Sequence, residues 1–419
     1  MSHTDLCFSG DQMLSADEAR QALVDAAVAV QEVESVSLAA ALGRVLAEHV
    51  VSPLDVPGYD NSAMDGYALN SADSADSADS AENGFSLPVS QRIPAGHPGG
   101  ELAPGTAARI FTGAPMPIGA DAVVMQEECE VEGNNIRIGR KVSPGENVRP
   151  RANDIASGDV VLSAGEKLRP QAVGLLASLG VAEVKVLRRL RVALLNSGDE
   201  IVEPGQPLQP GQIYNSNRYT LIATLQQVGC EIVDLGQVED TFEATRAALL
   251  EAAEKADLIL TSGGVSVGEE DHVKAAVEAE GEINLWRVRM KPGKPLAFGR
   301  VGQTPFVGLP GNPVSAFVTF CLFGMPFVRG MQGQGNSFPA PTKVRLPRAV
   351  EKPLKRREFI RVRLQKNAAD LPLAEAFPRQ GSDVLTSTVW ADGVLEIPDG
   401  TVLPANSALD FWSFESLLA

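Results

Sequence analysis

The sequence is poor in the residues that mark exported, zinc-binding and serine-hydrolase proteins. It has only four cysteines, and none of them forms a CxxC pair. The sequence therefore indicates neither a zinc site nor a disulfide framework, and it is typical of a protein with reduced thiols in the cytosol. None of its four histidines stands near a nucleophile elbow, so we expect no covalent enzyme intermediate. These residues are Cys7, Cys129, Cys230 and Cys321, and His3, His49, His97 and His272.

Positive charge and long apolar runs are also scarce. Lysine and arginine number 36 against 53 aspartate and glutamate, and the net charge of -17 disfavours general binding to nucleic acid or anionic membranes. The most apolar run, 314–328, is interrupted by Gly324 and Pro326 and is short for a membrane span, so we expect a buried helix. The N-terminus has no basic-then-apolar signal pattern. The sequence predicts a cytoplasmic protein with no membrane and no nucleic-acid partner.

What is present is enough for several folded domains. A length of 419 residues with 44% hydrophobic content predicts two to four of them. From Arg191 onward strands and helices alternate, which is typical of a parallel α/β sheet, whereas the segments before and after it read as small β domains. Further expected elements are a capped helix at 15–29, a second helix at 38–45, a short helix within 171–180, a linker at 337–341, and a solvated, mobile loop without a site in the SADSADSADS repeat at 71–80.

The stretch 257–271, DLILTSGGVSVGEED, combines a short strand, a glycine-rich turn and the start of a helix. Gly263, Gly264 and Gly268 allow close approach of the backbone to a ligand, and a helix start offers free N–H groups to phosphate. Carboxylates beside such a cradle suggest a divalent cation. The alternative is a tight turn in which Asp271 is only a helix cap.

Other polar loops follow neighbouring strands of the predicted sheet, and ligands of such sheets bind beyond the carboxyl ends of the strands. Each loop has an ordinary alternative: Glu200 could be a solvated acid, and Asp240 could cap a helix. In the turn Lys291-Pro-Gly-Lys294 two ammonium groups are held together, and an anion between them would relieve their repulsion. The residues expected to converge are Glu200, Asp240, Ser262, Gly263, Gly264, Lys291, Lys294, Pro310, Gly311 and Asn312.

Outside the α/β segment the signals are weaker. The stretch 60–69, DNSAMDGYAL, looks too polar for a strand core and reads as an Asx-type turn. Arg149, Arg151 and Asp154 form either a surface salt bridge or an oxyanion contact. In the strand 283–290, Trp286, Val288 and Met290 should face the core, while Arg287, Arg289 and Lys291 should face outward.

These motifs together resemble one family. The segments DNSAMDGYA, RIFTGAP, NSGDEI, TSGGVSVGEED, KPGKP and GLPGNPVSA are similar to those of the molybdopterin molybdenumtransferases, the bacterial relatives of the gephyrin E domain. The resemblance runs from about Ala22 to the C-terminus. It implies an enzyme that takes adenylylated molybdopterin and molybdate and, with Mg²⁺, releases AMP and molybdenum cofactor. Two departures are the lengthened loop at 71–80 and Asn196, where relatives often carry Ser or Thr.

The resemblance also implies an architecture, α/β plus β in four domains. An elongated domain is formed by 1–57 and 155–187, with a small β domain, 58–154, inserted into it. A doubly wound α/β catalytic domain covers 188–335 and a C-terminal β-barrel covers 336–419. Family members resemble one another in forming homodimers, so that Asp65 and Thr112 would act on the cleft of the other subunit.

Residue roles follow from the same resemblance. The matching functional positions are Asp65, Thr112, Glu200, Asp240, Asp271, Lys291 and Lys294, with secondary contacts at Arg149, Asp154 and Ser382. Of these, Glu200, Asp240 and Asp271 are the candidate Mg²⁺ ligands, and Arg287, Arg289 and Ser382 are candidates for molybdate. Expected partners include the molybdopterin adenylyltransferase and acceptor molybdoenzymes. Two alternatives stay open: adenylylation of molybdopterin, and a non-catalytic scaffold that carries the cofactor.

Overall fold

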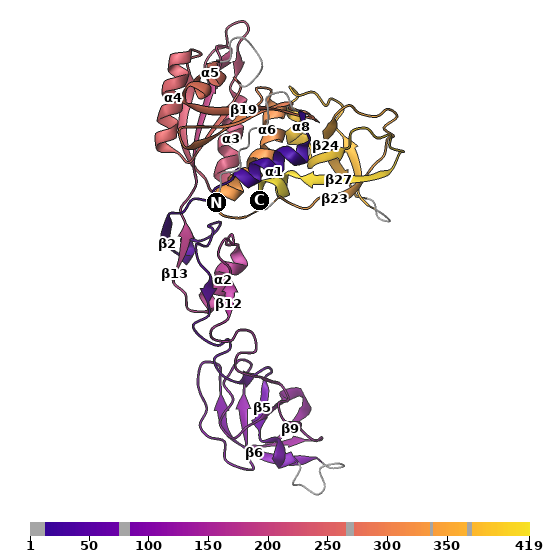
Figure 1. Cartoon of the computed structure of the whole chain (residues 1–419). Coiled ribbons are helices and arrows are strands. Elements are labelled where there is room, and N and C mark those ends of the chain that lie inside the picture. The colour runs from indigo at the N-terminus through magenta and orange to yellow at the C-terminus, as the bar shows by residue number, and fades with distance from the viewer. Residues whose placement is uncertain (1–12, 75–83, 265–271, 336–337, 367–370) are drawn as a thin grey trace. The chain divides into compact units, whose positions relative to one another are not determined.

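The computed structural model describes residues 13–74, 84–264, 272–335, 338–366 and 371–419. They fall into two compact units. The first comprises Met1–Ala47, Gly165–Arg169 and Glu183–Ala419, and the second comprises Glu48–Ala164 and Pro170–Ala182. Each unit is described below by itself, and the labels are those of Figure 1.

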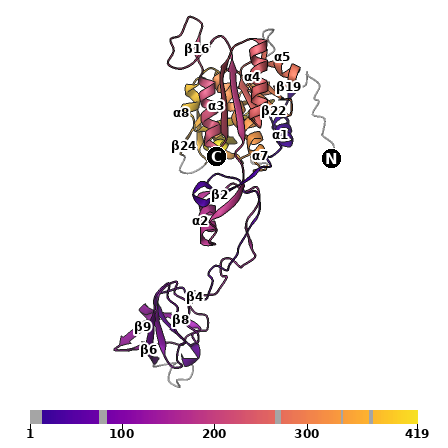
Figure 2. The ribbon, with the colours of Figure 1, turned by 90° about the vertical axis from the view of Figure 1, so that its left-hand side faces the viewer.

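The first unit is built on a seven-stranded sheet with helices on both faces. In β14 and β18 successive residues alternate between two hydrophobic clusters, because neighbouring side chains of a strand point to opposite faces. One cluster packs against α1, α3, α6 and α7, and the other packs against α4 and α5. Figure 2 shows strands of the sheet between α3 and α4. The strand order is β1 (Met13–Leu14), β19 (Gly281–Val288), β21 (Pro295–Val301), β22 (Thr304–Leu309), β18 (Leu258–Ser262), β14 (Arg191–Ser197) and β17 (Glu231–Val238).

The first helix begins where the sequence predicts. Ser15 caps α1 and forms a reciprocal capping box with Glu18. The run 314–328 is buried inside the protein, as expected. Within the described residues Pro313–Met331 alone is long and apolar enough to cross a membrane, and 89% of it is buried. The bounds are α1 (Ala16–Ala26), α3 (Ser216–Gln227), α4 (Phe242–Lys255), α5 (His272–Glu280), α6 (Pro313–Thr319), the π-helical turn η4 (Phe320–Gly324) and α7 (Met325–Met331).

The sheet is parallel only in part. Strands β17, β14, β18 and β22 are parallel, but β21 runs antiparallel to both β22 and β19. Because β21 is antiparallel to both neighbours, β19 runs in the same direction as β22. The Lys291–Lys294 turn follows the carboxyl end of β19 and so lies at the same edge of the sheet as the loops after the parallel strands. From the end of β19 into β20 (Met290–Lys291) the predicted alternation is confirmed, since Trp286, Val288 and Met290 are buried and the side chains between them are exposed.

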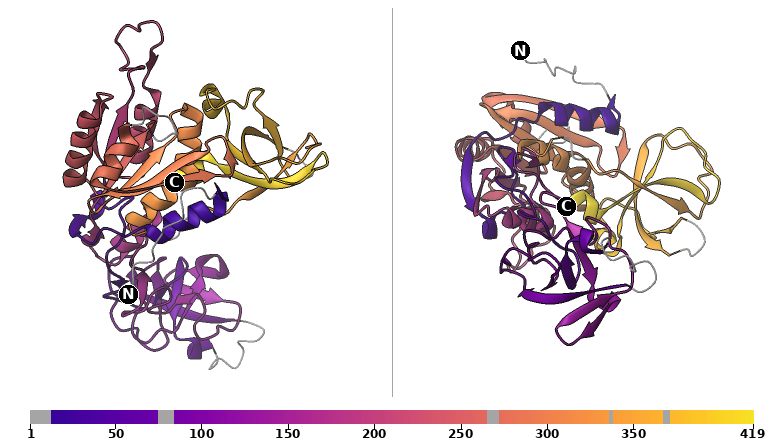
Figure 3. Two further views of the ribbon diagram at one scale, coloured as in Figure 1. Left: turned by 45° about the horizontal axis from the view of Figure 1, so that its top comes forward. Right: turned by 90° about the horizontal axis from the view of Figure 1, so that it is seen from below.

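A closed β-barrel ends the chain, as predicted, and forms the yellow strands of Figure 3. Pairing between β24 and β26 closes the five barrel strands. The short strand β20 pairs in parallel with the start of the barrel strand β24, with Lys291 opposite Glu358. The elements are β20 (Met290–Lys291), β23 (Thr342–Leu346), β24 (Arg357–Gln365), β25 (Leu373–Ala376), α8 (Thr386–Trp390), β26 (Gly393–Ile397), β27 (Ser407–Ser413) and α9 (Phe414–Leu418). The expected linker is partly packed, because the ring of Phe338 lies 5.9 Å from that of Trp412.

The rest of the first unit corrects one expectation. The predicted helix at 38–45 is only a 3₁₀ turn, η1 (Leu38–Ala40), because Gly43 takes a φ of +74° and Val45 and Leu46 pair with extended backbone at Lys167 and Val186. The remaining small pairs are β2 (Val33–Ser37) with β13 (Glu183–Leu187), and β15 (Ile201–Val202) with β16 (Ile213–Tyr214).

The second unit contains the predicted small β domain, a six-stranded sheet. Its order is β8 (Ala122–Met125), β5 (Gly66–Leu69), β7 (Ala107–Ile110), β6 (Phe85–Ile93), β10 (Asn135–Ile138) and β9 (Cys129–Glu132). The other elements are β3 (Val50–Val51), β4 (Asn61–Ser62), η2 (Ser71–Ser74), η3 (Gln126–Glu128), β11 (Val148–Arg149), β12 (Val160–Leu162) and the expected short helix α2 (Pro170–Ser178).

Two expectations for this unit are wrong. The stretch 60–69 contains the buried strand β5, which is possible because Gly66 has no side chain: a Cβ there would lie 2.0 Å from the carbonyl oxygen of Val124. The start of the serine-rich repeat is an ordered 3₁₀ turn whose Ser71 and Ser74 are buried, and Ser71 is bonded to Asp121. The rest of the repeat lies outside the described residues.

Candidate functional site

A cavity of about 1230 Å³ opens at the carboxyl edge of the α/β sheet in the first unit. It is formed by the ends of β14, β17 and β18, the first turns of α3 and α6, the turn between β19 and β21, and a barrel loop. The residues predicted to converge do so here: Glu200, Asp240, Ser262, Gly263, Gly264, Lys291, Lys294, Pro310, Gly311, Asn312 and Ser382 all line it. The predicted site residues Gly268 and Asp271 lie outside the described residues.

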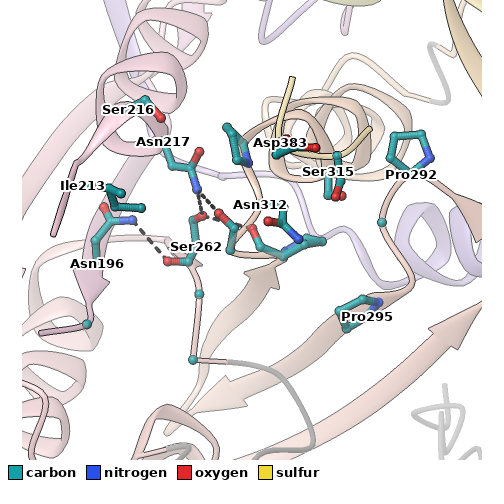
Figure 4. Close-up of a pocket in the computed structure, with 18 of the residues that line it drawn as sticks. Asn196, Ile213, Ser216, Asn217, Ser262, Pro292, Pro295, Asn312, Ser315 and Asp383 are labelled. Carbon is teal, nitrogen blue, oxygen red and sulfur yellow. Dashed lines mark hydrogen bonds between the residues drawn. The ribbon is translucent and has the colours of Figure 1, made fainter. Parts of the chain in front are cut away.

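The two glycine-rich loops are tied together by Asn217 in the first turn of α3. Its Nδ2 donates to the Oγ of Ser262 and to the carbonyl oxygen of Gly311, both at 2.7 Å (Figure 4). Ser262 Oγ in turn donates to the carbonyl oxygen of Pro310 at 3.2 Å. The loops after β18 and β22 are thereby held as one surface at the start of α6.

The cap of α6 leaves its N-terminus partly open to a ligand. Asn312 is the N-cap residue but its side chain makes no capping hydrogen bond, and Pro313 occupies the first turn. Pro313 has no N–H and the N–H of Val314 donates to the carbonyl oxygen of Ser382, so this helix start is open to an anion only in part.

The acidic side of the cavity carries Asp240 and Glu200. Asp240 does not cap α4, because Thr241 does so through its own hydroxyl. Instead the Oδ1 of Asp240 accepts a hydrogen bond of 2.8 Å from the Oγ of Ser197 at the end of β14. Ser197 thus fixes the orientation of one carboxylate while Glu200 remains exposed beside it. In the described part of the chain no group of three metal-ligating side chains gathers.

The basic side carries three cations. Lys291 pairs with Glu358 of the barrel at 3.2 Å, so its charge is partly compensated. Lys294 has no carboxylate within ion-pair distance in the ranges that the structure describes. Arg356, immediately before β24, also lines the cavity. An anion placed here meets positive charge from both the turn and the barrel.

Several predicted residues lie elsewhere. Arg287 on β19 and Arg289 just after it are exposed and do not line the cavity, and Arg289 faces Asp399 at 3.7 Å. Arg149 and Asp154 are exposed in the second unit, where Arg151 pairs with Asp55 rather than with Asp154.

The second unit brings Asp65 and Thr112 together. The Oδ1 of Asp65 accepts hydrogen bonds from the backbone N–H and the hydroxyl of Thr112, both at 2.7 Å. These bonds, the backbone one first, hold the pKa of the Asp65 carboxyl below its usual value. Asp65 is therefore a fixed, ionised acceptor on an exposed turn.

Sequence reasoning missed several residues of the cavity, namely Tyr214, Asn215, Asn217, Arg356 and Asp383. Asn215 and Asn217 open the helix that follows β14, so the rule that selected the other loops could have found them. Arg356 precedes a barrel strand and carries no recognisable signal.

Comparison with known proteins gives one consistent result. The chain matches the MoeA N-terminal region (domain I and II) over residues 14–180, a probable molybdopterin binding domain over 193–330 and the MoeA C-terminal region (domain IV) over 343–414. It is 44% identical over 324 residues to a molybdopterin molybdenumtransferase of Haemophilus influenzae, covering 77% of this chain and 78% of that one. It is 38% identical to molybdopterin molybdenumtransferase 2 of Mycobacterium tuberculosis, covering 90% and 94%.

A solved structure agrees with these matches. The molybdopterin biosynthesis MoeA protein of Pyrococcus horikoshii superimposes with a TM-score of 0.79 at 28% identity, covering 96% of this chain and 100% of that one. The similarity thus includes every domain of the chain. By its sequence, and with the fold in agreement, the chain belongs to the molybdopterin molybdenumtransferase family.

Proposed function

We propose that this enzyme inserts molybdenum from molybdate into adenylylated molybdopterin, with Mg²⁺-dependent release of AMP. Its membership of the family makes it a transferase of molybdenum cofactor biosynthesis. The finer statement is supported by one observation above all: two glycine-rich loops, a helix start, three cations and three carboxylates line one cavity of about 1230 Å³.

The cavity suits a large anionic substrate. Ligand pockets are usually about 300–1,000 Å³, so this one has room for a pterin that carries a nucleotide. We assign the phosphates to the loops at Gly263 and Gly311 beside the start of α6, within the same cavity as the cationic side chains. Lys291, Lys294 and Arg356 would neutralise the charge of the phosphoanhydride and of molybdate.

The donor set fits Mg²⁺, which is typically held by one or two carboxylates together with substrate phosphate oxygens and water. Asp240 and Glu200 supply those carboxylates at the edge of the cavity. When bound there, the ion would stabilise negative charge on the phosphates. The chain's own contribution is to orient Asp240 through Ser197 and to hold the phosphates through the loops that Asn217 joins.

We extend the proposal to the assembly and its location. The enzyme works as a homodimer in which Asp65 and Thr112 serve the cavity of the other subunit, receives its substrate from the molybdopterin adenylyltransferase and hands its product to acceptor molybdoenzymes. The resemblance of the motifs supports these statements. A cytoplasmic location is supported by Cys129, Cys230 and Cys321, which are free thiols.

The experiment that tests the proposal supplies purified protein with adenylylated molybdopterin and measures AMP with and without molybdate. Molybdate-dependent AMP release supports insertion. Consumption of ATP with free molybdopterin, and no AMP release from the adenylylated form, would instead make the protein an adenylyltransferase. Binding of the pterin with neither reaction would make it a carrier of the cofactor.

A further inference from the structure

A buried arginine lies directly behind one wall of the cavity. The side chain of Arg361 in β24 is only 1% exposed. Within the described ranges no carboxylate lies within ion-pair distance of it. Burial lowers the pKa of the guanidinium to about 10, and the nearby Asp383 opposes that shift, so Arg361 still carries a positive charge at neutral pH. A buried charge without a paired acid is costly and needs hydrogen bonds to stay in place.

The hydrogen bonds of Arg361 go to one segment of the barrel. Its Nη2 donates to the carbonyl oxygen of Gly381 at 2.8 Å, and its Nε donates to the Oγ of Ser387 at 3.0 Å. Its backbone N–H donates to the Oε1 of Gln380, whose Nε2 donates back to the carbonyl oxygen of Arg361, both at 2.9 Å. The loop 380–383 is therefore fastened to β24 at both its backbone and its side chains.

This loop is part of the cavity. Gln380, Gly381, Ser382 and Asp383 all line it, as does the Lys291–Lys294 turn. The carbonyl oxygen of Ser382 accepts a hydrogen bond of 3.0 Å from the backbone N–H of Val314 in α6, and Figure 4 shows Asp383 beside Ser315 of that helix. In the described part of the chain the Ser382 hydroxyl makes no hydrogen bond, so it is available to a ligand.

We propose that Arg361 is a positioning residue that sets the loop 380–383, and with it the Ser382 hydroxyl, to receive a tetrahedral oxyanion. The inference rests on the proposed function, in which that oxyanion is molybdate. Arg361 acts in two ways. Its planar fork fixes the loop through Gly381 and Ser387. Its buried charge favours an anion on the far side of the loop, because charges interact more strongly away from water.

The test compares Arg361→Gln and Arg361→Lys with wild type by AMP release at varied molybdate and at varied adenylylated molybdopterin, with thermal melts of each protein. Arg361→Gln should raise KM for molybdate by about 10- to 100-fold, as expected for a misplaced binding group, and leave KM for the pterin within about twofold. Arg361→Lys should give a KM for molybdate between those of wild type and Arg361→Gln, because lysine keeps the positive charge but lacks the planar guanidinium.

The matched control is Arg329→Gln. Arg329 is similarly buried, at 4% exposed, but donates to the carbonyl oxygens of Leu417 and Ser416, which do not line the cavity. The Arg329→Gln variant should have a lower melting temperature than wild type and an unchanged KM for molybdate. Ser387→Ala provides a milder second variant, which removes the partner of Nε and should raise KM for molybdate less than Arg361→Gln does.

The outcomes separate the two proposals. Wild-type protein that neither binds molybdate in calorimetric titration nor releases AMP would overturn the proposed function and the inference with it. Molybdate-dependent wild-type activity with an unchanged KM in folded Arg361→Gln and Ser387→Ala proteins would overturn the inference alone. Equal rises of both KM values would also overturn it, because they would indicate a general structural effect.

Discussion

Asp65 receives both donors of Thr112, the backbone N–H and the hydroxyl, on a single carboxylate oxygen at 2.7 Å. These bonds keep the pKa of Asp65 low. A carboxyl whose pKa is depressed in the folded state adds stability above its unfolded pKa, and this contribution is lost as the pH falls through the folded pKa.

We therefore predict that Thr112→Val raises the pKa of Asp65 toward its usual value but not fully, because the backbone N–H still donates. The acidic range in which Asp65 stays ionised would become narrower. Carboxyl carbon chemical shifts followed over pH measure this directly. Thr112→Ser keeps the hydroxyl and should leave the pKa in place, and a Thr112→Val protein that titrates like wild type would contradict the assignment.

A second prediction concerns the carboxylates at the edge of the cavity. If Asp240 binds the metal, Asp240→Asn should weaken Mn²⁺ binding, measured by electron paramagnetic resonance in the presence of AMP. Ser197→Ala removes the donor that orients Asp240 and should weaken the same binding by about 10-fold or more. Glu239→Gln is the control, since Glu239 is an exposed neighbour that does not line the cavity. Equal Mn²⁺ affinity in the wild type and all three variants would show that Asp240 does not bind the metal.

A third prediction concerns the turn that carries Lys291 and Lys294. Gly293 has a φ of +81°, and a Cβ there would lie 2.4 Å from the Oγ1 of Thr319. Gly302 also has a positive φ, +58°, but open space around it. Gly302→Ala should cost about 1–2 kcal/mol of unfolding free energy through backbone strain. Gly293→Ala should cost a further ~1–3 kcal/mol through overlap and also raise KM for the adenylylated substrate. Urea melts that rank the two variants equally would show that the turn adapts.

A fourth prediction concerns the side chain that joins the two glycine-rich loops. Asn217→Asp removes both donated hydrogen bonds and places a carboxylate against the carbonyl oxygen of Gly311. We expect kcat/KM for the adenylylated substrate to fall by about 10- to 100-fold, because the loops no longer share one position. Gln226→Ala, at an exposed position of the same helix, should have no effect. Wild-type kinetics in Asn217→Asp would mean that the loops hold their positions without this side chain.

The sequence predicted the α/β sheet and its edge well because strand and helix periods are local signals. The strand within 257–262 and the loops after the neighbouring strands could be predicted from that pattern together with the rule that ligands bind beyond the carboxyl ends of the strands. Prediction from the sequence failed where a single glycine changes the secondary structure that its neighbours adopt. Gly66 admits a polar stretch to the centre of a sheet, and Gly43 ends a helical pattern after one turn.

The cavity was predicted more fully on its sheet side than on its barrel side, where Ser382 alone was among the predicted residues. Arg356 and Arg361 approach the cavity only when the C-terminal barrel has formed, and neither stands in a motif that hydrophobic periodicity reveals. Burial of Arg361 in particular is a property of the closed barrel, because an arginine in a strand is ordinarily expected to reach solvent.

The most direct test of the account is amide hydrogen exchange of the protein with and without adenylylated molybdopterin. The account predicts that Gly263 and Gly264, Gly311 and Asn312, and Gly381 and Ser382 gain protection together on binding, since one ligand contacts all three loops. Protection confined to one loop, or located only outside the cavity, would contradict it.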